Sequence, residues 1–178
     1  MIGYRHVDPR YPFFWETADQ PPGRWHGAGE GPTQYIADTP EGAWAEFLRH
    51  EGIVDVSDLA GVRRAIWAID VPTRLVNRAV APALPVEVTT GGLDTYAACQ
   101  REARRLRALG AAALSAPSAA LVEAGASGWL VDGGLTPGPA RDGRVLALFG
   151  RHPRLVGWSA VHAGQPDPRI LPRVRQLS

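Results

Sequence analysis

Only two segments of this 178-residue chain space their apolar residues as an amphipathic α-helix requires. They cover residues 40–50 and about 95–109. Apolar residues elsewhere fall in short segments that end at proline or glycine, which is typical of strands. Helices and strands do not alternate regularly, as they would in a doubly wound sheet. We therefore predict an α+β fold, in which a few helices accompany mixed small sheets.

The remaining apolar segments predict a series of short strands. The first alternates Ile2, Tyr4 and His6 with the residues between them, and the later segments contain β-branched and aromatic residues. The connection over residues 72–93 is rich in proline, and we expect short extended pieces there. The expected strands cover residues 2–7, 33–37, 62–71, 111–115, 128–131, 144–149 and 155–162.

The ends of the two helices carry recognisable signals. Thr39 is the expected N-cap of the first helix, whose first residue is Pro40. Glu46 lies at the edge of the apolar stripe of that helix. Asp94 is the expected cap of the second helix, and Gly110 is expected to end it. The stripe of the first helix comprises Ala43, Trp44, Phe47 and Leu48.

The hydrophobic content of 45% is sufficient for one core, so we expect one domain over residues 1–178. Its core should span about residues 3–162. The segment 163–178 contains three prolines, and we expect it to be irregular or weakly packed on the surface.

Residues 11–31 combine proline, glycine and aromatic residues without periodicity, which predicts a long ordered loop. Ordered loops of this length are usually functional. The glycines at positions 27, 29 and 31 suggest a phosphate-binding loop, but they lack the spacing of a dinucleotide fingerprint and the Gly-Lys-Ser/Thr of a P-loop. A simple turn is the alternative interpretation.

Charge and cysteine content narrow the possible partners. A formal net charge of +1 disfavours direct binding to nucleic acid or to a membrane surface. Cys99 is the single cysteine, so neither an internal disulfide nor a cysteine-based zinc site is expected. The five histidines have no zinc-binding spacing, so we expect no metal. No signal sequence or membrane-spanning segment is found in the sequence, which favours a cytoplasmic protein.

Two further groups of polar residues have ordinary explanations. Ser118 follows a proline and lacks the flanking glycines of a nucleophile elbow, so it serves either as a cap or turn former or as a functional residue. Local sequence does not distinguish these roles. Arg101, Arg104 and Arg105 lie on one helix with Glu102, and we interpret them as a solvated helix face.

Four short motifs, taken together and in order, carry a family resemblance. The chain resembles the RES domain, a family named for an arginine, a glutamate and a serine, and the resemblance matches these to Arg24, Glu46 and Ser118. It spans about residues 3–158. At His26 the family usually has asparagine, which puts any contact of that amide in doubt. The motifs are Tyr4-Arg5, Gly23-Arg24-Trp25, Gln34-Tyr35-Ile36-Ala37 with Ala43-Trp44-Ala45-Glu46, and Ala116-Pro117-Ser118-Ala119.

The resemblance implies a fold similar to that of ADP-ribosyltransferases and the activity of a toxin that cleaves NAD⁺ at the nicotinamide–ribose bond. Hydrolysis and phosphorolysis are both open, so NAD⁺ is expected as the substrate and inorganic phosphate as a possible co-substrate, with no further cofactor. The resemblance also implies a cognate antitoxin with a helix-turn-helix domain. A homodimer is possible.

The chemistry of that cleavage suits the matched residues. Loss of nicotinamide leaves a cationic ribose, which the carboxylate of Glu46 would stabilise. The fork of Arg24 would bind phosphate oxygens with two donors. Tyr35 would stack on the substrate or position its ribose, and Ser118 would orient it. Trp25 and His26 complete the expected substrate-binding residues.

Each of these residues also has a purely structural interpretation: Glu46 at a solvent-exposed helix edge, Arg24 as a surface ion-pair partner, and Tyr35 as a core aromatic. Two other functions stay open. The same cationic intermediate allows transfer of ADP-ribose to a protein or nucleic acid. A non-catalytic NAD-binding or immunity module would keep the fold without turnover.

Overall fold

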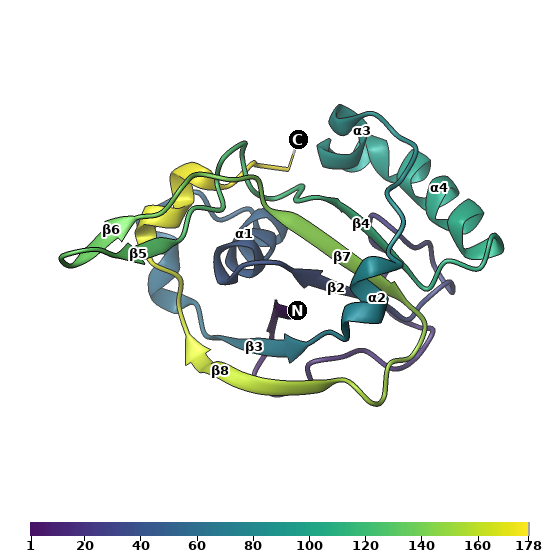
Figure 1. The fold of residues 1–178 in the computed structure, drawn as a ribbon, viewed down its shortest axis with the longest axis horizontal. Coiled ribbons are helices and arrows are strands. Elements are labelled where there is room, and N and C mark those ends of the chain that lie inside the picture. The colour runs from purple at the N-terminus through teal and green to yellow at the C-terminus, as the bar shows by residue number, and fades with distance from the viewer. Residues whose placement is uncertain (178) are drawn as a thin grey trace.

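In the computed structural model, which describes residues 1–177, the chain is built around a six-stranded antiparallel sheet with the order β4-β7-β2-β1-β3-β8 (Figure 1). The expected α+β class is confirmed, with a separate hairpin of two strands beside the large sheet. The main strands are β1 (Ile2–Val7), β2 (Thr33–Ala37), β3 (Arg64–Asp70), β4 (Ala113–Pro117), β7 (Arg144–Phe149) and β8 (Val156–Gly164).

The two central strands, β1 and β2, pair at a single register position, Tyr4 opposite Ala37. By contrast, β1 pairs with β3 over six positions and β2 pairs with β7 over five. A ladder this short leaves the backbone of both strands free to diverge beyond that pair. Most of the hydrogen bonds of the sheet therefore lie on either side of the β1–β2 pair. Residues of both central strands line a cavity.

Helix α1 (Pro40–Glu51) follows β2 and begins as the sequence predicts. The hydroxyl of Thr39 accepts a hydrogen bond from the backbone N–H of Gly42, and Pro40 occupies the first turn. Gly52 ends the helix in the left-handed conformation, with a φ of 64°. Ala45 and Leu48 are fully buried, so one face of α1 is fixed against the core while Glu46 stays at its edge.

The proline-rich connection contains two short helices, α2 (Thr73–Asn77) and α3 (Val86–Thr90), where extended pieces were expected. Five residues are too few to show helical periodicity in a sequence. Asp94 is not the expected cap, because it lies in a 3₁₀ turn (Leu93–Thr95) that precedes α4 (Tyr96–Ala108). Gly110 ends that helix with a φ of 84°, as expected.

The C-terminal segment is more ordered than its prolines suggest. Pro168–Arg173 forms a 3₁₀ helix capped by Asp167. Ile170 and Val174 are each only 6% exposed and pack in the same cluster as Leu48 and Leu121. The expectation of an irregular or weakly packed segment is therefore wrong for residues 168–174, because these isolated apolar side chains fill a gap beside α1. Ser178 lies outside the described residues.

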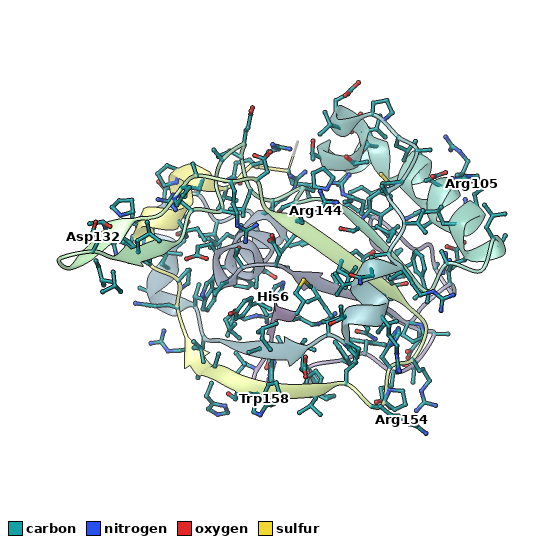
Figure 2. The ribbon with its side chains drawn as sticks, viewed as in Figure 1. His6, Arg105, Asp132, Arg144, Arg154 and Trp158 are labelled. Carbon is teal, nitrogen blue, oxygen red and sulfur yellow. The ribbon has the colours of Figure 1, made fainter. Side chains whose placement is uncertain are left out.

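A hairpin of β5 (Trp129–Val131) and β6 (Leu135–Pro137) projects from one end of the molecule, while α3 and α4 lie at the other end (Figure 1). The sequence predicts β5 but not β6. Asp132 marks the tip of the hairpin (Figure 2), and the turn contains Gly133 and Gly134 with positive φ. The other expected strands are present with shifts of about two residues at their ends.

Candidate active site

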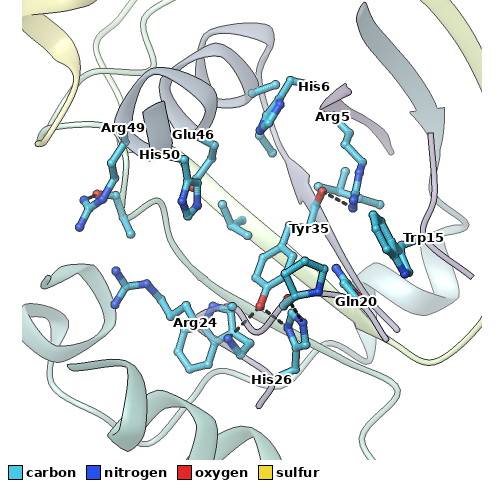
Figure 3. A pocket seen from close by; sticks show the side chains of 18 of the residues that line it. Arg5, His6, Trp15, Gln20, Arg24, His26, Tyr35, Glu46, Arg49 and His50 are labelled. Atoms are coloured by element: carbon cyan, nitrogen blue, oxygen red, sulfur yellow. Dashed lines mark hydrogen bonds between the residues drawn. The ribbon is translucent and has the colours of Figure 1, made fainter. Parts of the chain in front are cut away.

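A cavity of about 360 Å³ lies where β1 and β2 separate, which is within the range of small-molecule sites. One wall is formed by α1 and another by the long loop that precedes β2. Arg24 of the loop and Glu46 of α1 both line it. The structure therefore brings together the two side chains on which the sequence-based hypothesis depends. Figure 3 shows Arg24 and Arg49 on one side of the cavity, Arg5 and Trp15 on the other, and Tyr35 between them.

Glu46 has the environment of a carboxyl group withdrawn from water. Burial raises its pKa, while the nearby cations His50, Arg49 and Arg24 act in the opposite direction, as does a hydrogen bond from the Ser118 side chain. Within the described residues Glu46 forms no ion pair. Glu46 therefore holds its proton up to a higher pH than an exposed glutamate does, and once ionised it is a carboxylate facing the cavity.

Arg24 is 7% exposed and is held by neutral groups. Its Nη1 donates to Thr95 Oγ1 at 3.0 Å, and its Nη2 donates to the carbonyl of Gly91 at 2.7 Å. The guanidinium also lies 4.6 Å from the centre of the Tyr96 ring. No acidic side chain within residues 1–177 forms an ion pair with Arg24. The surface ion-pair interpretation is therefore wrong, and the charge is available to an anion.

The hydroxyl of Tyr35 connects three residues of the loop and strand. It accepts a hydrogen bond from the backbone N–H of Trp25 at 2.8 Å and lies 2.9 Å from His26 Nδ1. The other ring nitrogen of His26 lies 2.9 Å from the carbonyl of Pro21, so this nitrogen must carry the proton. Burial lowers the pKa of His26, which keeps the ring neutral. Tyr35 O–H therefore donates to Nδ1.

This network assigns His26 and Trp25 supporting positions. His26 is 1% exposed, and both of its ring nitrogens have protein partners. The indole of Trp25 is 2% exposed and packs in the core with Cys99 and Ala103, although the residue borders the cavity. Both residues hold Tyr35 and the arginine loop (residues 11–31, which carry Arg24) in place, and their side chains have little surface left for a substrate.

Ser118 is buried behind the cavity wall rather than on it, although its neighbours Pro117 and Ala119 line the cavity. Its Oγ accepts hydrogen bonds from the backbone N–H groups of Ala120 and Leu121 at 3.3 and 3.2 Å. These are the contacts of a turn-forming serine. The Ser118 side chain also lowers the pKa of Glu46, which links the turn to that carboxyl group.

Comparison with known proteins supports the resemblance seen in the motifs. The sequence model of the RES domain matches residues 4–170. The chain belongs to the RES domain family. A solved structure, the crystal structure of the M. tuberculosis MbcT-MbcA toxin-antitoxin complex, contains a chain of the same fold with a TM-score of 0.57 and 16% sequence identity. The alignment covers 96% of this chain and 86% of that one. No curated protein matches by sequence.

Several residues of the RES domain cavity were not predicted from the sequence. Arg49 lies three residues after Glu46, and helical spacing alone places it on the same side of α1. Arg5 of β1 belongs to the family motif, and burial lowers its pKa to about 10. The residues of the lining that sequence reasoning missed as site residues also include Tyr4, His6, Trp15, Gln20, His50 and Tyr96.

The glycine-rich run of this RES domain is a turn and not a phosphate loop. Its residues lie outside the cavity lining, and the backbone N–H of Gly27 donates to the carboxylate of Glu30 at 2.7 Å. Glu30 also forms ion pairs with Arg104 and Arg107 of α4, at 2.7 and 2.8 Å. The run therefore fastens the arginine loop to α4. These contacts order the loop, although residues 11–31 contain no β-strand.

Among residues 1–177 no group of three or more histidine, cysteine or acidic side chains is arranged to hold a metal ion. No helix in the described part of the RES domain has the length and apolar character needed to cross a membrane.

Proposed function

We propose that this RES domain is the toxin of a toxin–antitoxin pair and cleaves NAD⁺ at the nicotinamide–ribose bond. The observation that carries the proposal is the convergence of the Arg24 guanidinium and the Glu46 carboxyl group on one cavity. Membership of the RES family supports it, and so does the similarity in fold to a chain of a toxin–antitoxin complex. Such a toxin would act on the NAD⁺ pool of the cytoplasm.

In the proposed reaction the bond between the anomeric carbon and the nicotinamide nitrogen breaks. Its electron pair leaves with nicotinamide, which becomes neutral, and positive charge develops on the ribose. Ionised Glu46, which faces the cavity, stabilises that charge. An oxygen of water or phosphate then bonds to the anomeric carbon. Water loses a proton and yields ADP-ribose, whereas phosphate yields ADP-ribose 1-phosphate.

The remaining residues bind and orient the substrate in this proposal. Arg24 holds phosphate oxygens with its planar fork. The ring face of Tyr35 packs against the substrate, because its hydroxyl is already used by Trp25 and His26. Ser118 acts through Glu46, since its side chain lies behind the cavity wall. This changes its expected role from orienting the substrate to orienting the carboxylate.

The test follows labelled NAD⁺ with and without inorganic phosphate. Release of nicotinamide together with ADP-ribose indicates hydrolysis, and ADP-ribose 1-phosphate that forms only with phosphate indicates phosphorolysis. We expect Glu46→Gln to lower turnover by at least about 100-fold, because it removes the charge and keeps the shape. The matched control, Arg101→Gln on the exposed face of α4, should retain turnover. Label retained on protein or nucleic acid would assign transferase activity instead.

An absence of turnover by the folded, full-length chain would overturn the enzyme proposal and favour a non-catalytic module. The antitoxin and the oligomeric state are tested separately. We propose a helix-turn-helix protein encoded beside this gene as the partner. Its co-expression should abolish growth arrest and yield a co-purifying complex, and sedimentation of the Glu46→Gln chain alone would reveal a homodimer.

A further inference from the structure

A second buried arginine, Arg49 of α1, shares an acceptor with Arg24. The Nη2 of Arg49 donates to the carbonyl of Gly91 at 2.6 Å, and the Nη2 of Arg24 donates to the same oxygen at 2.7 Å. Arg49 also donates to the carbonyl of Ala119, and it is only 2% exposed. Figure 3 shows the two guanidinium groups extending toward one another on one side of the cavity. Two cations are thus held side by side.

The shared carbonyl depends on a glycine. A Cβ at position 91 would lie 2.5 Å from Thr95 Cγ2 and 2.7 Å from the carbonyl oxygen of Glu87. Real side chains do not tolerate such approaches, so only glycine fits the turn between α3 and α4 in this position. The turn is therefore built to present one backbone oxygen to both arginines.

Within residues 1–177 no salt bridge neutralises either charge of this arginine pair. Burial lowers the pKa of Arg49, and repulsion from Arg24 lowers it further. Among the described residues neither arginine forms an ion pair, and Glu46 is the carboxylate that faces them. Buried cations without an ion-pair partner are costly, so a bound anion would stabilise the pair.

We propose that Arg49 is a second substrate-binding arginine, which grips the diphosphate of NAD⁺ jointly with Arg24. This assignment rests on the proposed function, and it extends the binding site beyond the three residues for which the family is named. Among the residues that the structure describes, the bonds that hold the pair use only Nη atoms, which leaves the Nε–H of each guanidinium for phosphate oxygens. A diphosphate carries two negative charges, which matches two fixed cations.

The first test measures binding without turnover. In the full-length Glu46→Gln chain, titration calorimetry with ADP should show that Arg49→Gln weakens binding by about tenfold or more, because one charge-assisted contact is lost. Glutamine keeps an amide that can donate to the Gly91 carbonyl. Arg101→Gln removes the same charge from an exposed position and should leave ADP affinity unchanged. Equal affinity in the Arg49→Gln and Arg101→Gln chains would overturn the proposal.

The second test separates substrate binding from a purely structural role. NAD⁺ carries a diphosphate and nicotinamide riboside carries none, so Arg49→Gln should lower kcat/KM for NAD⁺ about tenfold while changing that for nicotinamide riboside little. A structural role would lower both values equally and would overturn the proposal. If Arg49→Gln does not fold by circular dichroism, Arg49→Lys replaces it, and the ratio of the two kcat/KM values should still fall.

The two proposals fail in distinguishable ways. If the wild-type chain does not cleave NAD⁺ but binds ADP or pyrophosphate in a manner that depends on Arg49, the proposed reaction fails and the anion site stands. If NAD⁺ is cleaved but neither binding nor the substrate ratio depends on Arg49, the proposed reaction stands and the arginine pair is structural.

Discussion

At the scale of single residues, Glu46 determines the expected pH dependence of activity. Its ordinary pKa is 4.5, and burial raises it in the folded protein. Only the ionised form can stabilise a cationic ribose, so activity should be lost as pH falls through this raised pKa. We therefore expect the acid limb of kcat/KM for NAD⁺ cleavage to lie above pH 4.5. His50→Gln should move the limb higher still, because one of the charges that oppose the shift is removed. A limb at or below the ordinary value would contradict this account.

The hydroxyl of Tyr35 is a second test at this scale. Tyr35→Phe leaves the buried N–H of Trp25 and the Nδ1 of His26 without their partner. An unsatisfied buried polar group costs about 1–3 kcal/mol, so we expect a loss of that size in the free energy of unfolding, measured in urea. Tyr11 is 61% exposed, and Tyr11→Phe should change stability by less than about 0.5 kcal/mol. Equal effects of the two substitutions would show that the network adds nothing.

At the scale of elements, Glu30 joins the arginine loop to α4. Burial alone would raise its pKa, but the N–H of Gly27 and the guanidinium groups of Arg104 and Arg107 hold it at about 2. Glu30→Gln removes both ion pairs, which are partly exposed, so we expect a loss of about 1 kcal/mol in stability. The loop carries Arg24, and its release should raise the KM for NAD⁺ and speed proteolysis within residues 11–31.

The control for that prediction is Glu16→Gln. Glu16 forms an ion pair with Arg151 in which both side chains are more than half exposed. Loss of this ion pair should leave the free energy of unfolding, the KM for NAD⁺ and the rate of proteolysis within residues 11–31 close to those of the wild type. If Glu30→Gln behaves in the same way, the loop is held by its other contacts, such as the paired hydrogen bonds between Gln20 and Thr33.

At the scale of the whole molecule, buried histidine makes the fold sensitive to acid. Burial lowers the pKa of His6 from 6.5 to about 3, with help from Arg64 and Arg5. The unfolded chain therefore binds a proton that the folded chain rejects, and the His6 contribution to stability, complete above pH 6.5, falls away toward pH 3. The slope from this one group approaches about 1.4 kcal/mol per pH unit. The raised pKa of Glu46 opposes this loss.

The measurement is urea unfolding between pH 4 and pH 7 for the wild type and two histidine variants. His6→Gln should flatten the dependence of the unfolding free energy on pH, whatever its effect at neutral pH. His162→Gln, at an exposed position of β8, should leave the slope as it is in the wild type. Identical slopes for all three chains would mean that His6 accepts a proton in the folded state.

Local interactions explain what the sequence by itself determined. The cap and first turn of α1, the end of α4 at Gly110, and the strands β2 and β7 arise from neighbouring residues, whose spacing is visible in the chain. The motifs around Arg24 and Glu46 likewise indicated the family, and both residues line the same cavity. The sequence predicted element boundaries and the short helices α2 and α3 less well, because five residues are too few to show a helical pattern.

Tertiary structure alone decided which polar groups face the cavity. Arg24 and Arg49 meet at the carbonyl of Gly91, which is 67 residues from one and 42 from the other, and no local pattern encodes that meeting. The same packing buries Trp25 in the core and turns Ser118 behind the wall. Side-chain direction depends on what packs around it, so the sequence predicts candidate residues and the fold decides which of them line the cavity.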